Sequence, residues 1–132
     1  MPALVRAAKL TAKAAKVGFD WPDPSQVVDK IQEELREVAE AAPTGDHDRI
    51  EDEIGDLLFA ATNLARHYGI DPEAALRRTN AKFERRFGAI EAALAAQGRS
   101  LEEAGLEEME SLWVAAKERE RTDTTPGGDA GR

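Results

Sequence analysis

The chain has 132 residues, 33 % of them charged, with a formal net charge of −8 at pH 7 and no cysteine. This length suits one domain with its own hydrophobic core. The negative charge disfavours binding to a nucleic-acid backbone, and the absence of cysteine excludes disulfide and thiolate chemistry. No apolar run approaches the ~20 residues of a membrane span, and no signal peptide is visible. We therefore expect a cytoplasmic protein with neither nucleic-acid nor membrane partners.

The composition predicts an all-α fold, because alanine is abundant whereas valine, isoleucine and aromatic residues are few. The first predicted helix covers residues 3–17, and Gly18 stands where a C-terminal cap is expected. Phe19 and Trp21 follow in a turn. They would either anchor this turn to the core or offer a stacking surface for a base.

The second predicted helix covers residues 24–42 and ends before a Pro-Thr-Gly turn. With ~100° of rotation per residue, its apolar side chains form one stripe. Glu34 falls at the edge of this stripe, whereas Glu33 faces away from it. A carboxylate at the border of a core is costly to ionise without a partner. The predicted stripe contains Val27, Val28, Ile31, Leu35, Val38, Ala39 and Ala42.

The third predicted helix begins near residues 46–48, where acidic residues suit a helix N-terminus, and ends at Tyr68 before Gly69. Its middle is apolar almost all round, with Phe59 opposite the main stripe. Because a small bundle offers only one core, we expect a second packing surface supplied by another subunit. The main stripe contains Ile50, Ile54, Leu57, Ala61, Leu64 and Tyr68.

These two helices carry the same acidic pattern, Glu34-x-x-Glu37 and Glu53-x-x-Asp56. Residues three apart project from one face of a helix, so each pattern presents a pair of carboxylates. On adjacent helices the two pairs can converge, and the four charges repel unless cations lie among them. Mg²⁺ or Mn²⁺ suits such oxygen ligands. The alternative is a solvated acidic face without a metal.

The fourth predicted helix starts at Asp71-Pro72, a capping residue followed by proline, and ends at Gln97-Gly98. Apolar residues at alternating spacings of four and three form a packing seam, which Asn80 interrupts. Asn80 is either a register-setting buried amide or a polar group facing a site. Lys82 and Arg86 form a cationic pair on the flank of this helix that suits phosphate.

The last predicted helix runs from Leu106 to about Arg119. We expect one domain over residues 1–120, built from about five helices, and a disordered tail over residues 121–132, which have nothing to bury.

Four segments of the chain resemble the MazG family of nucleoside triphosphate pyrophosphohydrolases, and the similarity extends from about Pro2 to Lys117. More narrowly, the chain is similar to the C-terminal of the two domains in full-length MazG proteins, and it is compatible with an excised domain or a short single-domain member. The ordered set of motifs is more specific than a lone ExxE. The four segments are VGFDW, VVDKxxEELxE, ExEIGDLLFAxxNLAR and NAKFERRF.

The resemblance implies a helical bundle of the all-α nucleoside triphosphate pyrophosphatase type, completed as a homodimer or a dimer of dimers. It implies hydrolysis of a nucleoside triphosphate to monophosphate and pyrophosphate, with Mg²⁺, or Mn²⁺ as a substitute, held by the four carboxylates. Arg49 stands where relatives often carry lysine, which keeps the charge and changes the geometry. The further site residues that match the family are Lys30, Glu33, Lys82, Arg86 and Trp113.

Direct attack of water on the α-phosphorus is the simplest mechanism for these residues, since the sequence contains no Walker loop. Lys82 and Arg86 would hold the phosphates. Either Glu33 or Glu37 could take the proton of the water, and the sequence does not choose between them.

Two other protein classes also use acidic helices. A di-iron carboxylate bundle needs Glu-x-x-His pairs, and neither His47 nor His67 has glutamate three residues before it. A non-catalytic acidic helical dimer, acting as a regulatory or interaction module, remains the alternative. Release of pyrophosphate would separate the enzyme from such a module.

Overall fold

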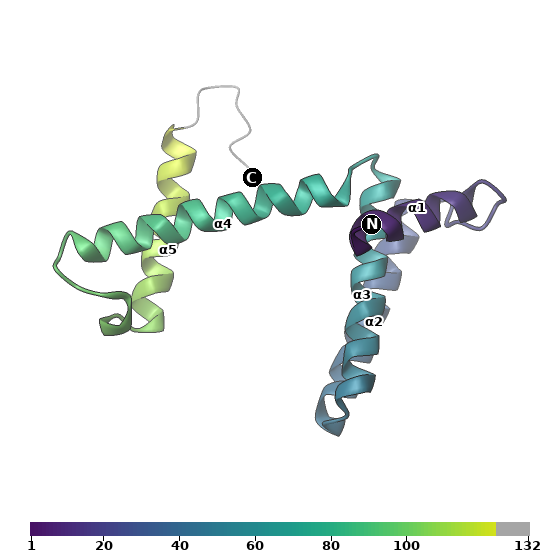
Figure 1. The fold of residues 1–132 in the computed structure, drawn as a ribbon, viewed down its shortest axis with the longest axis horizontal. Helices are drawn as coiled ribbons and strands as arrows, with labels where there is room; N and C mark the ends of the chain where they lie inside the picture. The colour runs from purple at the N-terminus through teal and green to yellow at the C-terminus, as the bar shows by residue number, and fades with distance from the viewer. Residues whose placement is uncertain (124–132) are drawn as a thin grey trace. The chain divides into compact units, whose positions relative to one another are not determined.

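The computed structural model describes residues 1–123, which form five α-helices and two short 3₁₀ helices and contain no strand (Figure 1). The predicted all-α fold with about five helices is therefore confirmed. No helix within this range is long and apolar enough to cross a membrane. The α-helices are α1 (Ala3–Ala15), α2 (Pro24–Ala41), α3 (His47–His67), α4 (Pro72–Ala95) and α5 (Leu106–Asp123), and the 3₁₀ helices are η1 (Ala42–Thr44) and η2 (Leu101–Glu103).

Aspartate side chains cap the N-termini of three helices. The carboxylate of Asp23 accepts a hydrogen bond from the backbone N–H of Ser25 at the start of α2. Asp46 and Asp71 accept equivalent bonds at the starts of α3 and α4. These contacts satisfy backbone donors that have no partner inside the helix, so the caps visible in the sequence set where the helices begin.

Glycine ends α1 and α3 in the way that the sequence predicts. Gly18 and Gly69 adopt positive φ angles of 89° and 69°, a conformation that a side chain would disfavour. After Gly18, the backbone N–H of Phe19 donates to the carbonyl of Ala14, and this bond folds the chain back on the last turn of α1. The direction of the turn that carries Phe19 is fixed in this way.

The end of α5 differs from its prediction. The helix continues to Asp123, beyond the expected end near Arg119. Within the added turn, Glu120 pairs with Arg85 and Arg86 of α4 at distances of 3.1 and 3.0 Å, and these contacts hold the turn in place. The rest of the predicted tail, residues 124–132, lies outside the described residues.

The chain divides into two compact units, Met1–Arg77 and the residues from Arg78 onward, which are described separately. In the first unit α2 and α3 lie side by side, joined by η1, and α1 packs against α3 (Figure 1). The buried face of α2 carries Val27, Glu34 and Ala41 at a spacing of seven residues. On α3, the same spacing separates Glu53, Ala60 and His67.

These two lines of residues, spaced by seven, differ from the apolar stripes expected from the sequence. Leu35 of α2 is 52 % exposed and Ile54 of α3 is 41 % exposed, so their assignment to the core of this chain is wrong. A seven-residue spacing keeps one line of side chains facing a neighbouring helix. In this chain that line includes a carboxylate from each helix, and the larger apolar side chains lie beside it.

In the second unit α4 and α5 cross (Figure 1), and Ile90 and Leu94 of α4 and Ala116 of α5 are buried. The ring of Phe83 lies 5.5 Å from that of Trp113, measured between centroids. The crossing therefore has a small apolar core with an aromatic pair at its side.

Candidate functional site

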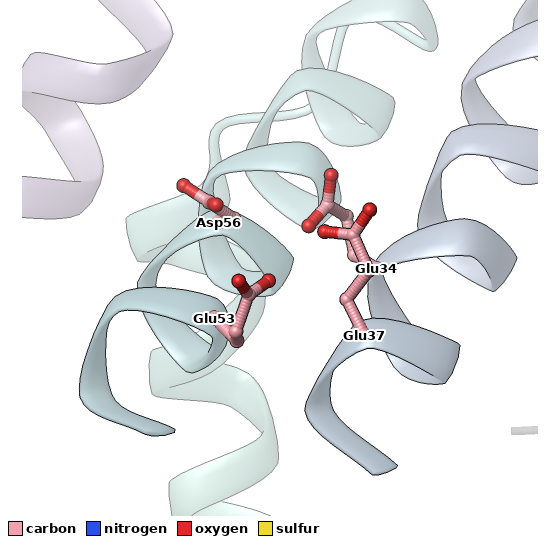
Figure 2. A group of neighbouring side chains, drawn as sticks. All are labelled: Glu34, Glu37, Glu53 and Asp56. Carbon is pink, nitrogen blue, oxygen red and sulfur yellow. The ribbon is translucent and has the colours of Figure 1, made fainter. Parts of the chain in front are cut away.

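Four carboxylates converge between α2 and α3. Glu34 and Glu37 project from α2, and Glu53 and Asp56 project from α3 (Figure 2). Each residue offers one oxygen atom, and these four atoms all lie within 4.8 Å of one another. The convergence follows from the sequence, because each pair is spaced three residues apart and the two helices lie side by side. We call these four residues the carboxylate cluster.

The cluster is partly shielded from water. Glu34 is only 4 % exposed, Glu37 and Glu53 are half-buried, and Asp56 is exposed. Within residues 1–123, the buried Oε2 atoms of Glu34 and Glu53 have no hydrogen-bond partner. A buried carboxylate oxygen without a partner carries a desolvation penalty. Two such oxygens in one cluster indicate that a group outside the chain completes their coordination.

Two carboxyl groups of the cluster have raised pKa values. A hydrogen bond with Glu53, together with the charge of Glu34, raises the pKa of Glu37 to about 7. Burial and the nearby charges of Glu34, Asp52 and Glu53 raise the pKa of Asp56. Both shifts favour the protonated form of these two carboxyl groups when no cation is bound.

Lys30 neutralises part of this charge. Its Nζ atom lies 3.0 Å from Oε1 of Glu34 and 3.7 Å from Oε2 of Glu33. The hydrogen bond to Glu34 raises the pKa of Lys30, so the ammonium form is favoured. Because Lys30 occupies only one oxygen of Glu34, the other remains directed to the cluster. Four converging carboxylates, two of which have a buried unpartnered oxygen, fit a hard divalent cation such as Mg²⁺ or Mn²⁺.

A pocket of about 530 Å³ lies against the cluster in the first unit. Glu34 and Asp56 line it together with Lys30. The rest of the lining comes from α1, α2, α3 and the turn after α1. These further residues are Leu10, Thr11, Ala14, Gly18, Phe19, Asp20, Trp21, Val27, Phe59, Ala60 and Asn63.

The turn after α1 is tied to α3 by a polar network. The Nη2 group of Arg66 donates a hydrogen bond of 2.6 Å to Oδ1 of Asp20, and Nε2 of His67 lies 3.0 Å from the same oxygen. Arg66 Nε also donates to Thr11 of α1 and to Asn63 of α3. Burial would raise the pKa of Asp20, but the hydrogen bonds from Arg66 and His67 lower it below its usual value. His67 therefore holds the turn and is not part of the carboxylate cluster.

Besides Lys30, two predicted site residues of the first unit lie outside the carboxylate cluster. Glu33 is exposed on α2 and contacts Lys30. Arg49 is exposed in the first turn of α3, where its backbone N–H donates to Asp46.

The other predicted site residues belong to the second unit. The side chain of Arg86 pairs with Glu120, and its guanidinium carbon lies 5.5 Å from the centre of the Trp113 ring. Arg86 is only 6 % exposed, and the bond to Arg86 lowers the pKa of Glu120. Lys82 is half-buried and Asn80 is exposed. The structure thus brings Arg86 and Trp113 together.

The sequence did not identify most of the pocket or its polar network. The segments that resemble the family contain Asp20, Asn63 and Arg66, but the sequence alone did not indicate that these residues form a network. Their contacts join residues 46 and 55 positions apart, such as Asp20 with Arg66 and Thr11 with Arg66. Local spacing on one helix carries no signal for such contacts.

Comparison with known proteins matches residues 23–88, half of the chain, to the MazG nucleotide pyrophosphohydrolase domain. The chain is 47 % identical over 122 residues to a nucleoside triphosphate pyrophosphohydrolase of Escherichia coli, covering 91 % of this chain and 46 % of that protein. It is 43 % identical to the nucleoside triphosphate pyrophosphohydrolase/pyrophosphatase MazG of Thermotoga maritima, covering 92 % of this chain and 47 % of that protein. The chain spans about half the length of these two relatives.

The matched segment contains α2, α3 and most of α4, and therefore all four residues of the carboxylate cluster. The chain belongs to the MazG family of nucleotide pyrophosphohydrolases.

Proposed function

We propose that this chain hydrolyses nucleoside triphosphates to nucleoside monophosphate and pyrophosphate, and that it requires Mg²⁺. The observation that carries the proposal is the carboxylate cluster with its two buried, unpartnered oxygens. The names of the relatives from Escherichia coli and Thermotoga maritima support the reaction. We place this activity in the cytoplasm, where nucleoside triphosphates are made and used.

Glu34, Glu37, Glu53 and Asp56 would hold the metal. When bound, Mg²⁺ supplies positive charge to the phosphate oxygens and Lewis acidity toward water, and Mn²⁺ accepts the same oxygen ligands. Lys30 holds Glu34 in place through its 3.0 Å contact. The protein thus contributes a preorganised set of negative charges and one lysine that orients the most buried of them.

Glu33 is our choice for the group that accepts the proton of the attacking water. It lies one residue before Glu34 and outside the carboxylate cluster, so its oxygens stay available when a cation is bound. The Nζ atom of Lys30 lies 3.7 Å from its Oε2 atom. Glu37 is the other carboxylate that could serve, but it would already be a metal ligand.

Lys82 and Arg86 are proposed to bind the phosphates beyond the metal, with Arg49, Asn80 and Trp113 as further substrate contacts. In the second unit Arg86 is held by Glu120, which fixes its guanidinium against Trp113. Substrate phosphate would therefore approach an arginine whose position is already set.

We also propose a homodimer, or a dimer of dimers, as the functional form. Several large apolar side chains of α2 and α3 are exposed in the single chain. A large exposed apolar patch is unusual on a monomeric protein and is typical of an interface. The exposed residues are Val28, Leu35, Ile54, Leu58 and Phe59.

The decisive experiment measures products. The purified chain is incubated with each nucleoside triphosphate and Mg²⁺, and pyrophosphate and orthophosphate are quantified separately. We expect pyrophosphate and monophosphate in equal amounts. Orthophosphate and diphosphate as the first products would contradict the proposal, and no turnover at all would support a non-catalytic metal-binding module.

A further inference from the structure

One carboxylate near the end of α5 holds one edge of the Arg86 guanidinium. Oε1 of Glu120 accepts a hydrogen bond of 3.1 Å from Nε of Arg86 and lies 3.0 Å from Nη2 of the same group. These two contacts use the edge between Nε and Nη2 and leave the edge between Nη1 and Nη2. Arginine binds phosphate most strongly through such an edge, with two parallel N–H groups. Glu120 therefore determines which edge of Arg86 is presented to an anion.

The face of the same guanidinium is held by an aromatic side chain. The Cζ atom of Arg86 lies 5.5 Å from the centre of the Trp113 ring, and that ring lies 5.5 Å from the ring of Phe83. An arginine side chain has many rotamers in water, and ordering it opposes the binding of a ligand. Because the edge and the face of Arg86 are both held, a phosphate does not have to order this side chain.

Glu120 also contacts a second arginine, but the two contacts differ in exposure. Its Oε2 atom accepts a hydrogen bond of 3.1 Å from Nε of Arg85, which is exposed, whereas Arg86 is buried. An ion pair in water contributes little to stability. The hydrogen bond from Arg86 is the main cause that lowers the pKa of Glu120, so the carboxylate is ionised at neutral pH. The contact with Arg86 is therefore the one with a consequence for a site.

We propose that Glu120 is a positioning residue for the reaction, which holds Arg86 so that its Nη1 edge is presented to a substrate phosphate. The proposal rests on the proposed function, in which Arg86 binds phosphate. Glu120 itself does not contact the substrate. Charge alone makes the opposite prediction, because a carboxylate near a phosphate site repels the phosphate, and its removal would strengthen binding.

The test measures binding of an α,β-methylene nucleoside triphosphate with Mg²⁺, and kcat/KM for release of pyrophosphate. Glu120→Ala should weaken binding and lower kcat/KM by roughly tenfold or more, the effect of losing one hydrogen bond to a charged group. Glu120→Gln also removes the charge but keeps an oxygen that can accept from Arg86, so its loss should be smaller. Unchanged or tighter binding by a folded Glu120→Ala protein would overturn the proposal.

Two controls separate this role from a general effect on the fold or the charge. Glu118→Ala makes the same change of charge on the same helix, at an exposed residue that pairs only with Arg121, and it should bind the analogue as wild type does. The rise in melting temperature with Mg²⁺ should be the same in all these variants, because the carboxylate cluster lies on α2 and α3. If Glu120→Ala does not fold, Glu120→Gln decides, and unchanged or tighter binding by it would overturn the proposal.

A double-mutant cycle shows whether Glu120 acts through Arg86. Arg86→Met removes the guanidinium, while Glu120 keeps its contact with Arg85. In the Arg86→Met background, replacing Glu120 by glutamine should cause no further loss, because the side chain that it positions is absent. A loss as large as in the wild-type background would show that Glu120 acts independently of Arg86, and would refute the positioning role.

The two proposals fail differently. Wild-type protein that binds the analogue but releases no pyrophosphate would refute the reaction, and binding of the analogue would still decide the role of Glu120. Pyrophosphate release with the same kcat/KM in wild type and in both Glu120 variants would keep the reaction and refute the positioning role.

Discussion

The Nζ atom of Lys30 lies 3.0 Å from Oε1 of Glu34, while Oε2 of the same carboxylate is buried and unpartnered within residues 1–123. One oxygen of the Glu34 carboxylate thus has a partner in the chain, and the other oxygen has none within the described residues. The lysine is one turn before Glu34 on α2, so the helix itself sets this division. A cation in the cluster would complete a carboxylate that the protein has already oriented.

Divalent metal should stabilise the folded chain even without substrate. Mg²⁺ or Mn²⁺ binds the assembled cluster better than the separated carboxylates of the unfolded chain. At a hundredfold excess over the dissociation constant, the gain in unfolding free energy is about 2.7 kcal/mol. We expect the melting temperature, followed by circular dichroism, to rise with Mg²⁺ more than with NaCl of matched ionic strength.

This effect can be tested with one variant in the cluster and one control outside it. Asp56→Asn should leave the metal-free melting temperature unchanged or raise it, since it removes one repelling charge, and it should reduce the response to Mg²⁺. Glu40→Gln, on the exposed side of α2, should keep the full response. If wild-type protein responds to Mg²⁺ no more than to NaCl, the four carboxylates do not bind metal as one site.

The metal-free protein should lose stability as the pH rises toward neutrality. Folding raises the pKa of Glu37 from 4.5 to about 7, so between these values the folded state holds more protons than the unfolded state. The contribution of Glu37 is therefore fully present below about 4.5 and is lost as the pH passes through about 7. Urea unfolding in a chelator, measured across this window, should show the decline, and Glu37→Gln should flatten it. A wild-type profile that rises over the same window, and that Glu37→Gln leaves unaltered, would exclude this coupling.

The sequence predicted the elements well because their signals are local. Capping aspartates and terminal glycines lie next to the helix ends that they set, such as Asp71 before α4 and Gly69 after α3. The carboxylate pairs were also visible, since residues three apart on one helix share a face. Their convergence needed only one assumption, that α2 and α3 are neighbours.

What the sequence could not show depends on contacts between distant residues. A helix with ~100° of rotation per residue would place Leu35 and Ile54 in the core. In the structure, the residues packed between α2 and α3 instead lie on the adjacent line, at a spacing of seven. The bond between Arg86 and Glu120 joins positions 34 apart and extends α5 beyond its expected end. The pocket depends on three segments at once, and no single window of sequence contains them.

Assembly should depend on the exposed apolar residues of α2 and α3. Leu58 is among them and does not line the pocket, so Leu58→Glu tests the interface without altering the pocket. Burial of one such side chain contributes about 2 kcal/mol. Light scattering at micromolar concentration should show a dimer or larger assembly for wild type and a smaller species for Leu58→Glu. Leu106→Glu, at an exposed leucine of α5, is the matched control. A compact, stable wild-type monomer would refute the proposed dimer.

Variants of Glu33 and Glu53 should lose activity for different reasons, because we propose that Glu33 accepts the proton of the attacking water and that Glu53 binds the metal. Glu53 belongs to the carboxylate cluster, so Glu53→Gln should lower both the Mg²⁺ response of the melting temperature and the rate of pyrophosphate release. Glu33 is outside the cluster, so Glu33→Gln should keep the Mg²⁺ response and lower kcat by roughly a hundredfold or more, the usual effect of losing a general base. Calorimetry with Mg²⁺ and steady-state kinetics on the same preparations make the comparison. Loss of metal binding in Glu33→Gln would assign Glu33 to the metal site, and full activity in that variant would leave Glu37 as the proton acceptor.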